Sequence, residues 1–447
     1  MTVARILGLG TYPIQRPVHG GQRRVAAFKQ FYERKKITYT YSCIYNGWHY
    51  HAGDVGPHDR AFVPKTELLA NVIGDVLSGH QGAMDPAFFK HFSNIVAQVT
   101  PDALQLEQPF MWPVAKRLRQ MSGSRKPLLI YSSHNVEAPL KRAVLVSSGI
   151  PAEDWSQLCS EIEEMEAEIA SEADLIVCVS EADREYYRRE LRSPSPVIVV
   201  RNGTDRPERR VMPHAPDALS SFQGGPYLMT VGSAHVPNIE GLCRYVINGG
   251  VFCVPPAPSL AICGGIAAAI RDHPEYRRYR AAIDKRVKFF VDVSDAELSA
   301  IKEGCHGVFL PIHEGGGTNL KTAEALALGK WVVATSTALR GFEAFLNADG
   351  VVVADTRADF RHAIRQVLRR PPFVLTKSSR AARDALYWDR CFDDSELPTF
   401  FGDAHGLVPS RNSRERSGAL GCELAAAGRG GMSPKNVSRL AIGSAES

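Results

Sequence analysis

The residues best suited to chemistry stand in one short block, His313–Glu324, which reads HEGGGTNLKTAE. An apolar run typical of a buried strand, Val308–Pro311, comes directly before it, and its second half predicts a helix that begins near Thr318. Glycines let backbone N–H groups approach an anion closely, and the start of a helix adds partial positive charge. The block therefore predicts a binding site for a diphosphate.

Two charged residues extend this prediction to a nucleotide. Lys321 adds a full positive charge, and Glu324, about one and a half turns into the helix, is placed to accept both hydroxyls of a ribose. The spacing matches neither a Walker loop nor the Gly-x-Gly-x-x-Gly loop of dinucleotide sites. The alternative, an ordinary helix capped by Thr318 after a flexible turn, stays open on these residues alone.

Short β-rich runs alternate with longer amphipathic segments along the chain, which is typical of βα units around parallel sheets. A polar, turn-rich segment, Asn202–Gly225, separates two halves and predicts an interdomain linker. Helices are expected at Glu153–Ser171 and near Ser378–Asp389. Strands are expected at Ile6–Gly10, Ile37–Ile44, Ala103–Leu106, Leu128–Ser132, Leu175–Val179, Val197–Val200, Tyr227–Val231, Leu260–Cys263, Lys288–Val291, Gly307–Pro311, Trp331–Thr335 and Gly350–Val353.

The bulk composition is that of a two-domain globular protein. The chain has 447 residues, of which 44% are hydrophobic and 23% charged, and no apolar run approaches the roughly 20 residues that span a bilayer. The N-terminus shows no signal-peptide pattern. Nine cysteines stand singly, which predicts reduced thiols in a reducing compartment. We therefore expect a cytoplasmic protein.

The net charge of +5 is unevenly spread, because basic residues outnumber acidic ones in roughly the first 150 residues. A solvated surface is the ordinary explanation, and a field that attracts phosphates or the inner face of an anionic membrane is the alternative. Peripheral membrane association therefore stays open. No aromatic-basic interleaving or nucleic-acid motif is present, so we expect no nucleic-acid partner.

A resemblance to a known family emerges from the order of these motifs. The block from Lys288 to Phe342 resembles the family 4 glycosyltransferases of the GT-B fold, because a strand, Val293–Leu298, a second strand, the glycine loop and Glu-Ala-Leu-Ala-x-Gly-Lys follow one another. The resemblance extends over roughly residues 5 to 390. It implies an α/β protein with two Rossmann-like βαβ domains facing a central cleft. The implied parts are an acceptor-binding domain at 1–205, a nucleotide-sugar-binding domain at 206–373 and a returning helix at 374–402 that packs towards the first domain. Residues 403–447 are rich in Gly, Ser and Arg and show no periodicity, which predicts a disordered tail.

The resemblance also implies a donor site in the second half. The family carries two Glu separated by seven residues, and the second, which usually holds the ribose, falls on Glu324, whereas the first would fall on Gly316. Either Glu314 or the loop amides take over the contact with the donor sugar. The Arg and Lys that many members place after the first strand of the second domain are also absent, since Ser233-Ala234-His235 stands there. The expected donor-binding residues are Gly315, Gly316, Gly317, Thr318, Asn319, Lys321, Glu324, Gly232 and Ser233.

Two motifs of the first half complete the pattern. Gly20-Gly21 follows the first strand where the family has a glycine loop facing phosphate and acceptor, and Arg23 and Arg24 add positive charge; a plain turn is the alternative. His134 ends a strand, and ligands of open α/β sheets bind beyond the carboxyl ends of strands. The family has a His here that contacts the transferred sugar, so His134 and Glu324 are the expected catalytic residues, with a structural histidine as the alternative.

The implied activity is a retaining, hexosyltransferase-like transfer of sugar from a nucleotide-diphosphate donor to a sugar or lipid-linked acceptor, in polysaccharide or glycolipid synthesis. Two alternatives stay open: a catalytically degenerate scaffold or binding subunit, and a nucleotide-sugar epimerase or hydrolase. No cofactor beyond the nucleotide sugar and no metal is expected. Asp-x-Asp is absent, and His49, His51 and His58 lack a completing ligand at a recognisable spacing.

Overall fold

The computed structural model of the chain describes residues 4–65, 67–123, 126–147, 149–207, 217–314 and 317–402. Contacts divide these residues into two compact units, the first formed by 4–200 and 392–402 and the second by 201–391. The segment 374–402 therefore contributes to both units. The middle of the expected linker (208–216), the centre of the glycine loop (Gly315 and Gly316) and the tail at 403–447 lie outside the described residues.

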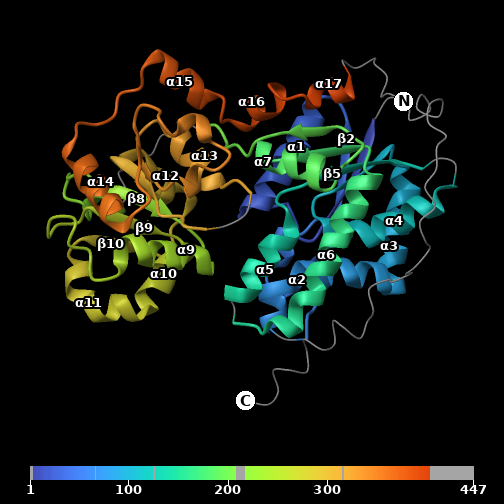
Figure 1. Ribbon diagram of the computed structural model, residues 1–447, viewed down its shortest axis with the longest axis horizontal. Coiled ribbons are helices and arrows are strands. Elements are labelled where there is room, and N and C mark those ends of the chain that lie inside the picture. The colour runs from blue at the N-terminus through green and yellow to red at the C-terminus, as the bar shows by residue number, and fades with distance from the viewer. Residues whose placement is uncertain are drawn as a thin grey trace. The chain divides into compact units, whose positions relative to one another are not determined.

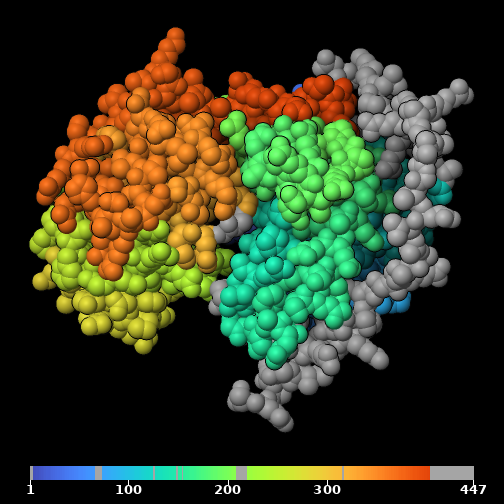
Figure 2. Space-filling model, in the orientation of Figure 1, coloured from blue at the N-terminus to red at the C-terminus, as the bar shows by residue number. Residues whose placement is uncertain are grey.

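The first unit is built on a seven-stranded parallel sheet in the order β3-β2-β1-β4-β5-β6-β7. Its strands are β1 (Arg5–Gly10), β2 (Thr38–Asn46), β3 (Arg60–Phe62), β4 (Ala103–Leu106), β5 (Leu128–Ser132), β6 (Leu175–Cys178) and β7 (Val197–Val199). Its helices are α1 (Gly20–Arg34), α2 (Glu67–Met84), α3 (Pro86–Val99), α4 (Trp112–Met121), α5 (Glu137–Ser147), α6 (Ala152–Glu172), α7 (Glu181–Glu185) and α17 (Leu397–Phe401). In Figure 1, α5 and α6 pack side by side, and Figure 2 shows them as one continuous part of the unit's surface.

The second unit has a six-stranded parallel sheet in the order β10-β9-β8-β11-β12-β13. Its strands are β8 (Leu228–Val231), β9 (Leu260–Cys263), β10 (Val287–Phe290), β11 (Gly307–Leu310), β12 (Trp331–Ala334) and β13 (Val351–Val353). Its helices are α8 (Asp217–Ser220), α9 (Val236–Leu242), α10 (Gly265–Asp272), α11 (Pro274–Asp284), α12 (Asp295–Gly304), α13 (Leu320–Ala327), α14 (Arg357–Arg369) and α15 (Lys377–Asp384), while α16 (Trp388–Asp393) runs across the boundary. Tyr186–Glu190 and Cys243–Ile247 continue α7 and α9 as π-helical turns.

Successive side chains along each strand point to opposite faces of the sheet, and the apolar ones form the buried cores. In the second sheet, Leu228, Ile262 and Phe309 face one buried cluster, whereas Met229 and Val308 face another on the opposite side. This period of two with both faces apolar is what a parallel sheet covered by helices requires. The sequence runs that predicted these strands are therefore confirmed to within two residues at each end.

Of the other predictions made from the sequence, two are confirmed and one is wrong. The helix expected at Glu153–Ser171 is confirmed as α6, and the eight cysteines of the described residues are all free thiols, as expected. The single helix expected at Ser378–Asp389 is wrong. It is split into α15 and α16 because the backbone of Leu386 and Trp388 hydrogen-bonds with Thr204 instead of continuing the helix.

In the part of the chain that the structure describes, no helix has both the length and the apolar composition needed to cross a bilayer.

Candidate functional site

Each sheet reverses its strand order once, and ligands of open α/β sheets bind beyond the carboxyl ends of the strands at such a reversal. In the second sheet the reversal lies between β8 and β11. The residues that follow these strands are Gly232-Ser233 and His313-Glu314, with the glycine loop next in the chain. The topology therefore brings the expected donor residues of both segments to one edge of the sheet.

The helix after the glycine loop starts one residue later than the sequence suggested. Its N-cap is Asn319, whose side chain accepts a hydrogen bond from the Lys321 N–H at 3.1 Å. Thr318 is not the cap, because its hydroxyl accepts a hydrogen bond from the Asn202 amide at 2.8 Å and the residue is buried. Gly317 has φ +55°, a left-handed conformation that glycine adopts without strain, and its carbonyl accepts from Arg340 at 2.7 Å. The end of the loop is thus firmly held.

Lys321 points from this helix towards the segment after β8. Its Nζ donates to Asn238 Oδ1 at 2.8 Å, and a Cβ at Gly232 would lie only 3.1 Å from the same nitrogen. Asn238 is in turn held to Ser233 through its Nδ2 at 3.2 Å. Burial lowers the pKa of Lys321 to about 8, and the nearby Glu324 carboxylate opposes this shift only in part. A partly desolvated ammonium at this edge of the sheet is a strong attractor for an anion.

Glu324 is paired within the unit rather than free. Its Oε1 forms a short ion pair with Lys302 of α12, and the two side chains are only 23% and 18% exposed. A carboxylate has about four acceptor positions, so Oε2 keeps capacity for the hydroxyls of a ribose. Lys302 is a residue that sequence reasoning missed, because it lies 22 residues from Glu324 on another helix.

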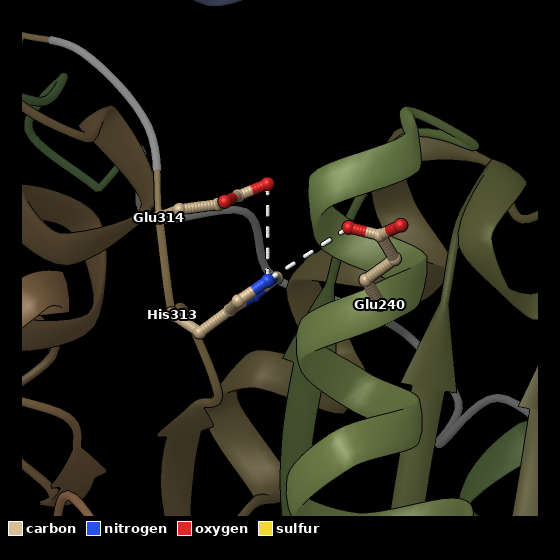
Figure 3. A group of neighbouring side chains, drawn as sticks. All are labelled: Glu240, His313 and Glu314. Atoms are coloured by element: carbon tan, nitrogen blue, oxygen red, sulfur yellow. Dashed lines mark ion pairs between the residues drawn. The ribbon is translucent and has the colours of Figure 1, made fainter. Parts of the chain in front are cut away.

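Three further side chains gather beside the start of the glycine loop (Figure 3). His313 Nε2 lies 3.8 Å from a carboxylate oxygen of Glu314 and 3.8 Å from one of Glu240, which reaches across from α9. Both carboxylates turn towards the imidazole in Figure 3. The three ligand atoms lie within 4.8 Å of one another, a spacing at which the group could hold a metal ion. The three side chains form an ion-pair cluster, and imidazole and carboxylate are groups that also bind metal ions.

The first sheet reverses between β1 and β4, and a hydrogen-bonded network fills this point. Tyr12 follows β1, Glu107 follows β4 and His134 follows β5, the next strand of the sheet. The Tyr12 hydroxyl lies 3.1 Å from His134 Nδ1, and His134 Nε2 lies 3.3 Å from Glu107 Oε2. His134 is thus confirmed at the carboxyl end of its strand, but the structure gives it two partners that the sequence did not indicate.

Glu107 is fully buried and held by several donors. Its Oε1 accepts hydrogen bonds from the Tyr39 hydroxyl at 2.8 Å and from Gln105 Nε2 at 2.6 Å. Tyr39 can reach it because Gly8 leaves no side chain in the way: a Cβ there would lie 2.1 Å from the Tyr39 oxygen. A buried carboxylate without such partners would cost several kcal/mol, so the surrounding donors are what allow it here.

The glycine loop of the first unit opens α1. His19 is the N-cap and accepts from the Gln22 N–H, while Gly20 and Gly21 form the first turn. Arg23 is partly exposed next to this turn. Arg24, by contrast, is only 1% exposed, and it donates to the Val200 carbonyl at 2.9 Å and lies over the Phe28 ring. Its charge therefore acts from inside the unit, where it helps to lower the pKa of His134.

Residues 54–207 match the family model described as Glycosyltransferase Family 4, and residues 226–370 match that of Glycosyl transferases group 1. No protein with a curated description matches the chain.

Solved structures share the arrangement over most of the chain. Sucrose-phosphate synthase from Thermosynechococcus elongatus has a TM-score of 0.63 and 16% identity, covering 87% of this chain and 96% of that one. HepE from Anabaena, solved with UDP-glucose, has a TM-score of 0.52 and 13% identity, covering 87% and 94%. WaaG, described as a glycosyltransferase involved in lipopolysaccharide biosynthesis, has a TM-score of 0.51 and 13% identity, covering 87% and 95%.

These structural likenesses establish the fold, which is the two-domain Rossmann-like GT-B architecture expected from the sequence. The two family models, one on each unit, identify the activity class. The match at 226–370 covers both strands of the second reversal point, and the match at 54–207 covers β4 and β5 of the first sheet, so fold and family agree at these elements. The chain belongs to the family 4-type glycosyltransferases and is an enzyme of glycosyl transfer.

Proposed function

We propose that the second unit binds a nucleotide-diphosphate sugar and that the first unit binds a sugar or lipid-linked acceptor. The diphosphate rests on the glycine loop and Lys321, and the ribose on Glu324. The observation that supports this assignment best is the position of Lys321, whose ammonium is fixed by Asn238 beside Gly232. The Lys321 ammonium thereby lies next to both segments of the reversal point, the one after β8 and the helix that follows the glycine loop.

Lys321 also explains how the transfer is accelerated. Cleavage of the bond between sugar and diphosphate leaves extra negative charge on the leaving diphosphate. A cation and backbone N–H groups that are already in place stabilise this charge without reorganising, which is usually the largest catalytic contribution. The fixed ammonium replaces the Arg and Lys that many family members carry after β8, and it performs this role without a metal ion.

Similar proteins support the nature of the substrates. HepE was solved with UDP-glucose and with UDP, and WaaG is described as acting in lipopolysaccharide biosynthesis. We therefore infer a UDP-type donor and a role in polysaccharide or glycolipid synthesis. From the resemblance to the family 4 glycosyltransferases we infer transfer with retention of the anomeric configuration.

The donor sugar itself needs a contact in place of the missing first Glu. Glu314 supplies it, because it lies two residues before Gly316, its side chain is 51% exposed, and His313 holds its carboxylate at 3.8 Å. Replacing Glu314 with Gln should therefore raise the KM for the nucleotide sugar and leave the Kd for UDP unchanged.

Calorimetric titration of the full chain with UDP, GDP and ADP tests the proposal. We expect UDP to bind in preference to GDP and ADP, and Glu324→Gln to weaken its binding through the lost ribose contact. Glu343→Gln, in a short turn of the same unit, is the matched control and should bind as the wild type does. If none of the nucleoside diphosphates binds the wild-type chain, the donor site is misplaced.

A further inference from the structure

His134 has no ring nitrogen left for a substrate. Nδ1 is 3.1 Å from the Tyr12 hydroxyl, and Nε2 is 3.3 Å from Glu107. The side chain is only 10% exposed and Glu107 is not exposed at all. A direct contact between this imidazole and a sugar would therefore require one of two internal hydrogen bonds to break.

Chemistry fixes the direction of the two hydrogen bonds. A carboxylate only accepts, so His134 donates from Nε2–H to Glu107, and the bare Nδ1 accepts from the Tyr12 O–H. Burial lowers the pKa of His134, and Arg24 acts in the same direction against the opposing effect of Glu107, so the ring is neutral, as this arrangement requires. Burial and then Glu107 raise the pKa of Tyr12, which keeps its hydroxyl protonated.

The oxygen of Tyr12 lies against the glycine loop of α1. A Cβ at Gly21 would be 2.3 Å from it, so the hydroxyl touches the backbone there and only glycine allows the approach. Tyr12 and His134 are both partly exposed, whereas Glu107 is buried. Because its proton is committed to His134, the hydroxyl presents acceptor capacity on its remaining lone pair.

We propose that Tyr12 is the group of this network that contacts the acceptor, accepting a hydrogen bond from a sugar hydroxyl. His134 and Glu107 are positioning residues that fix the orientation of the Tyr12 O–H. Gly21 and Tyr12 together form the acceptor subsite, which explains why glycine stands at the first turn of α1. This inference rests on the proposed function, since it deepens the assignment of the acceptor to the first unit.

Tyr12→Phe is the primary test, with octyl β-D-glucopyranoside as the acceptor probe and saturation-transfer NMR as the measure of binding. Loss of one neutral hydrogen bond should weaken binding about fivefold to tenfold. Gly21→Ala, which keeps the hydroxyl but displaces it, should have a similar effect. UDP binding, measured by calorimetry on the same samples, should be unchanged in both variants and shows that they are folded.

The orientation of the network is tested without any ligand. Nitrogen-15 NMR of histidine-labelled protein should show His134 neutral with its proton on Nε2, and Tyr12→Phe should shift the Nδ1 signal. Glu107→Gln should disturb the same signal while UDP binding persists. A proton found on Nδ1, or wild-type binding of the glucoside by Tyr12→Phe, overturns the inference. Absence of glucoside binding to the wild type, with UDP binding intact, contradicts the acceptor subsite and leaves the donor site standing.

Discussion

The two units have the same topology at their reversal points but different chemistry there. In the second unit, a helix start and one fixed cation stand next to the glycine loop in the chain, and these residues lie close together in the sequence. In the first unit, Tyr12, His134 and Glu107 fill the corresponding point with an internal network whose members are 27 to 122 residues apart. The second unit presents a fixed positive charge at this point, whereas in the first unit the polar groups hydrogen-bond with one another. If the proposed function holds, the comparison teaches that the same sheet geometry serves a charged donor in one unit and a neutral, hydroxyl-bearing acceptor in the other.

The largest expected effect is that of removing the cation of the second unit. Lys321→Ala should lower the turnover of the nucleotide sugar about 10²–10³-fold, because the charge on the leaving diphosphate loses its preorganised partner. Lys377→Ala, an exposed lysine of the same unit, is the matched control and should keep wild-type turnover. Steady-state kinetics with saturating donor measure the effect. Equal rates in Lys321→Ala and the control would show that the leaving group is stabilised elsewhere.

The same lysine predicts how donor binding depends on pH. The pKa of Lys321 is about 8 in the empty site, and a bound diphosphate raises it, so binding above pH 8 takes up a proton. The Kd for the nucleoside diphosphate should therefore increase up to about tenfold for each unit of pH above 8. Titrations between pH 7 and 10 in buffers of different ionisation enthalpy reveal the proton. A Kd that stays constant over this range contradicts the role of Lys321.

Buried carboxyls give the first unit a different response to pH. Burial raises the pKa of Glu137 to about 8 and that of Glu166 to about 7, so both keep their protons in the folded state at pH values where the unfolded chain has lost them. Since the folded state then binds more protons, the free energy of unfolding falls as the pH rises from about 4.5 through 8. Each proton contributes a slope of up to about 1.4 kcal/mol per pH unit.

Glu137→Gln, which keeps a neutral hydrogen-bonding side chain, should remove one proton from that slope, and urea unfolding at pH 5, 6, 7 and 8 measures it. Glu153→Gln, an exposed position near the start of α6, is the matched control. If the slope of the Glu137 variant equals that of the control, the carboxyl is ionised in the folded state.

The same contrast explains what the sequence could predict. Strands and the helix after the glycine loop follow from local periodicity and from contiguous residues such as Gly317 to Glu324, so reading along the chain finds them. Lys302 beside Glu324 and Glu107 beside His134 depend on which strands and helices are neighbours in space, and each residue is ordinary in its own surroundings. The break before Trp388 has the same origin, because its cause is a backbone pairing with the distant Thr204. The periodicity of the sequence does not show which distant segments pair with one another.

The smallest expected effect is that of removing divalent cations. If Lys321 and the loop amides hold the diphosphate, EDTA should leave donor turnover unchanged, because no step of the proposed transfer uses a metal ion. The ion-pair cluster of Glu240, His313 and Glu314 makes this a sharp test, since its donor types suit Mn²⁺ or Zn²⁺ and it lies beside the glycine loop. EDTA could instead lower the activity, with Mn²⁺ restoring it in the wild type but not in Glu240→Gln. That result would show that a metal ion binds the phosphate together with Lys321. The two units would then differ in that the second uses a metal ion and the first does not, rather than in that the second has a fixed lysine and the first a neutral tyrosine.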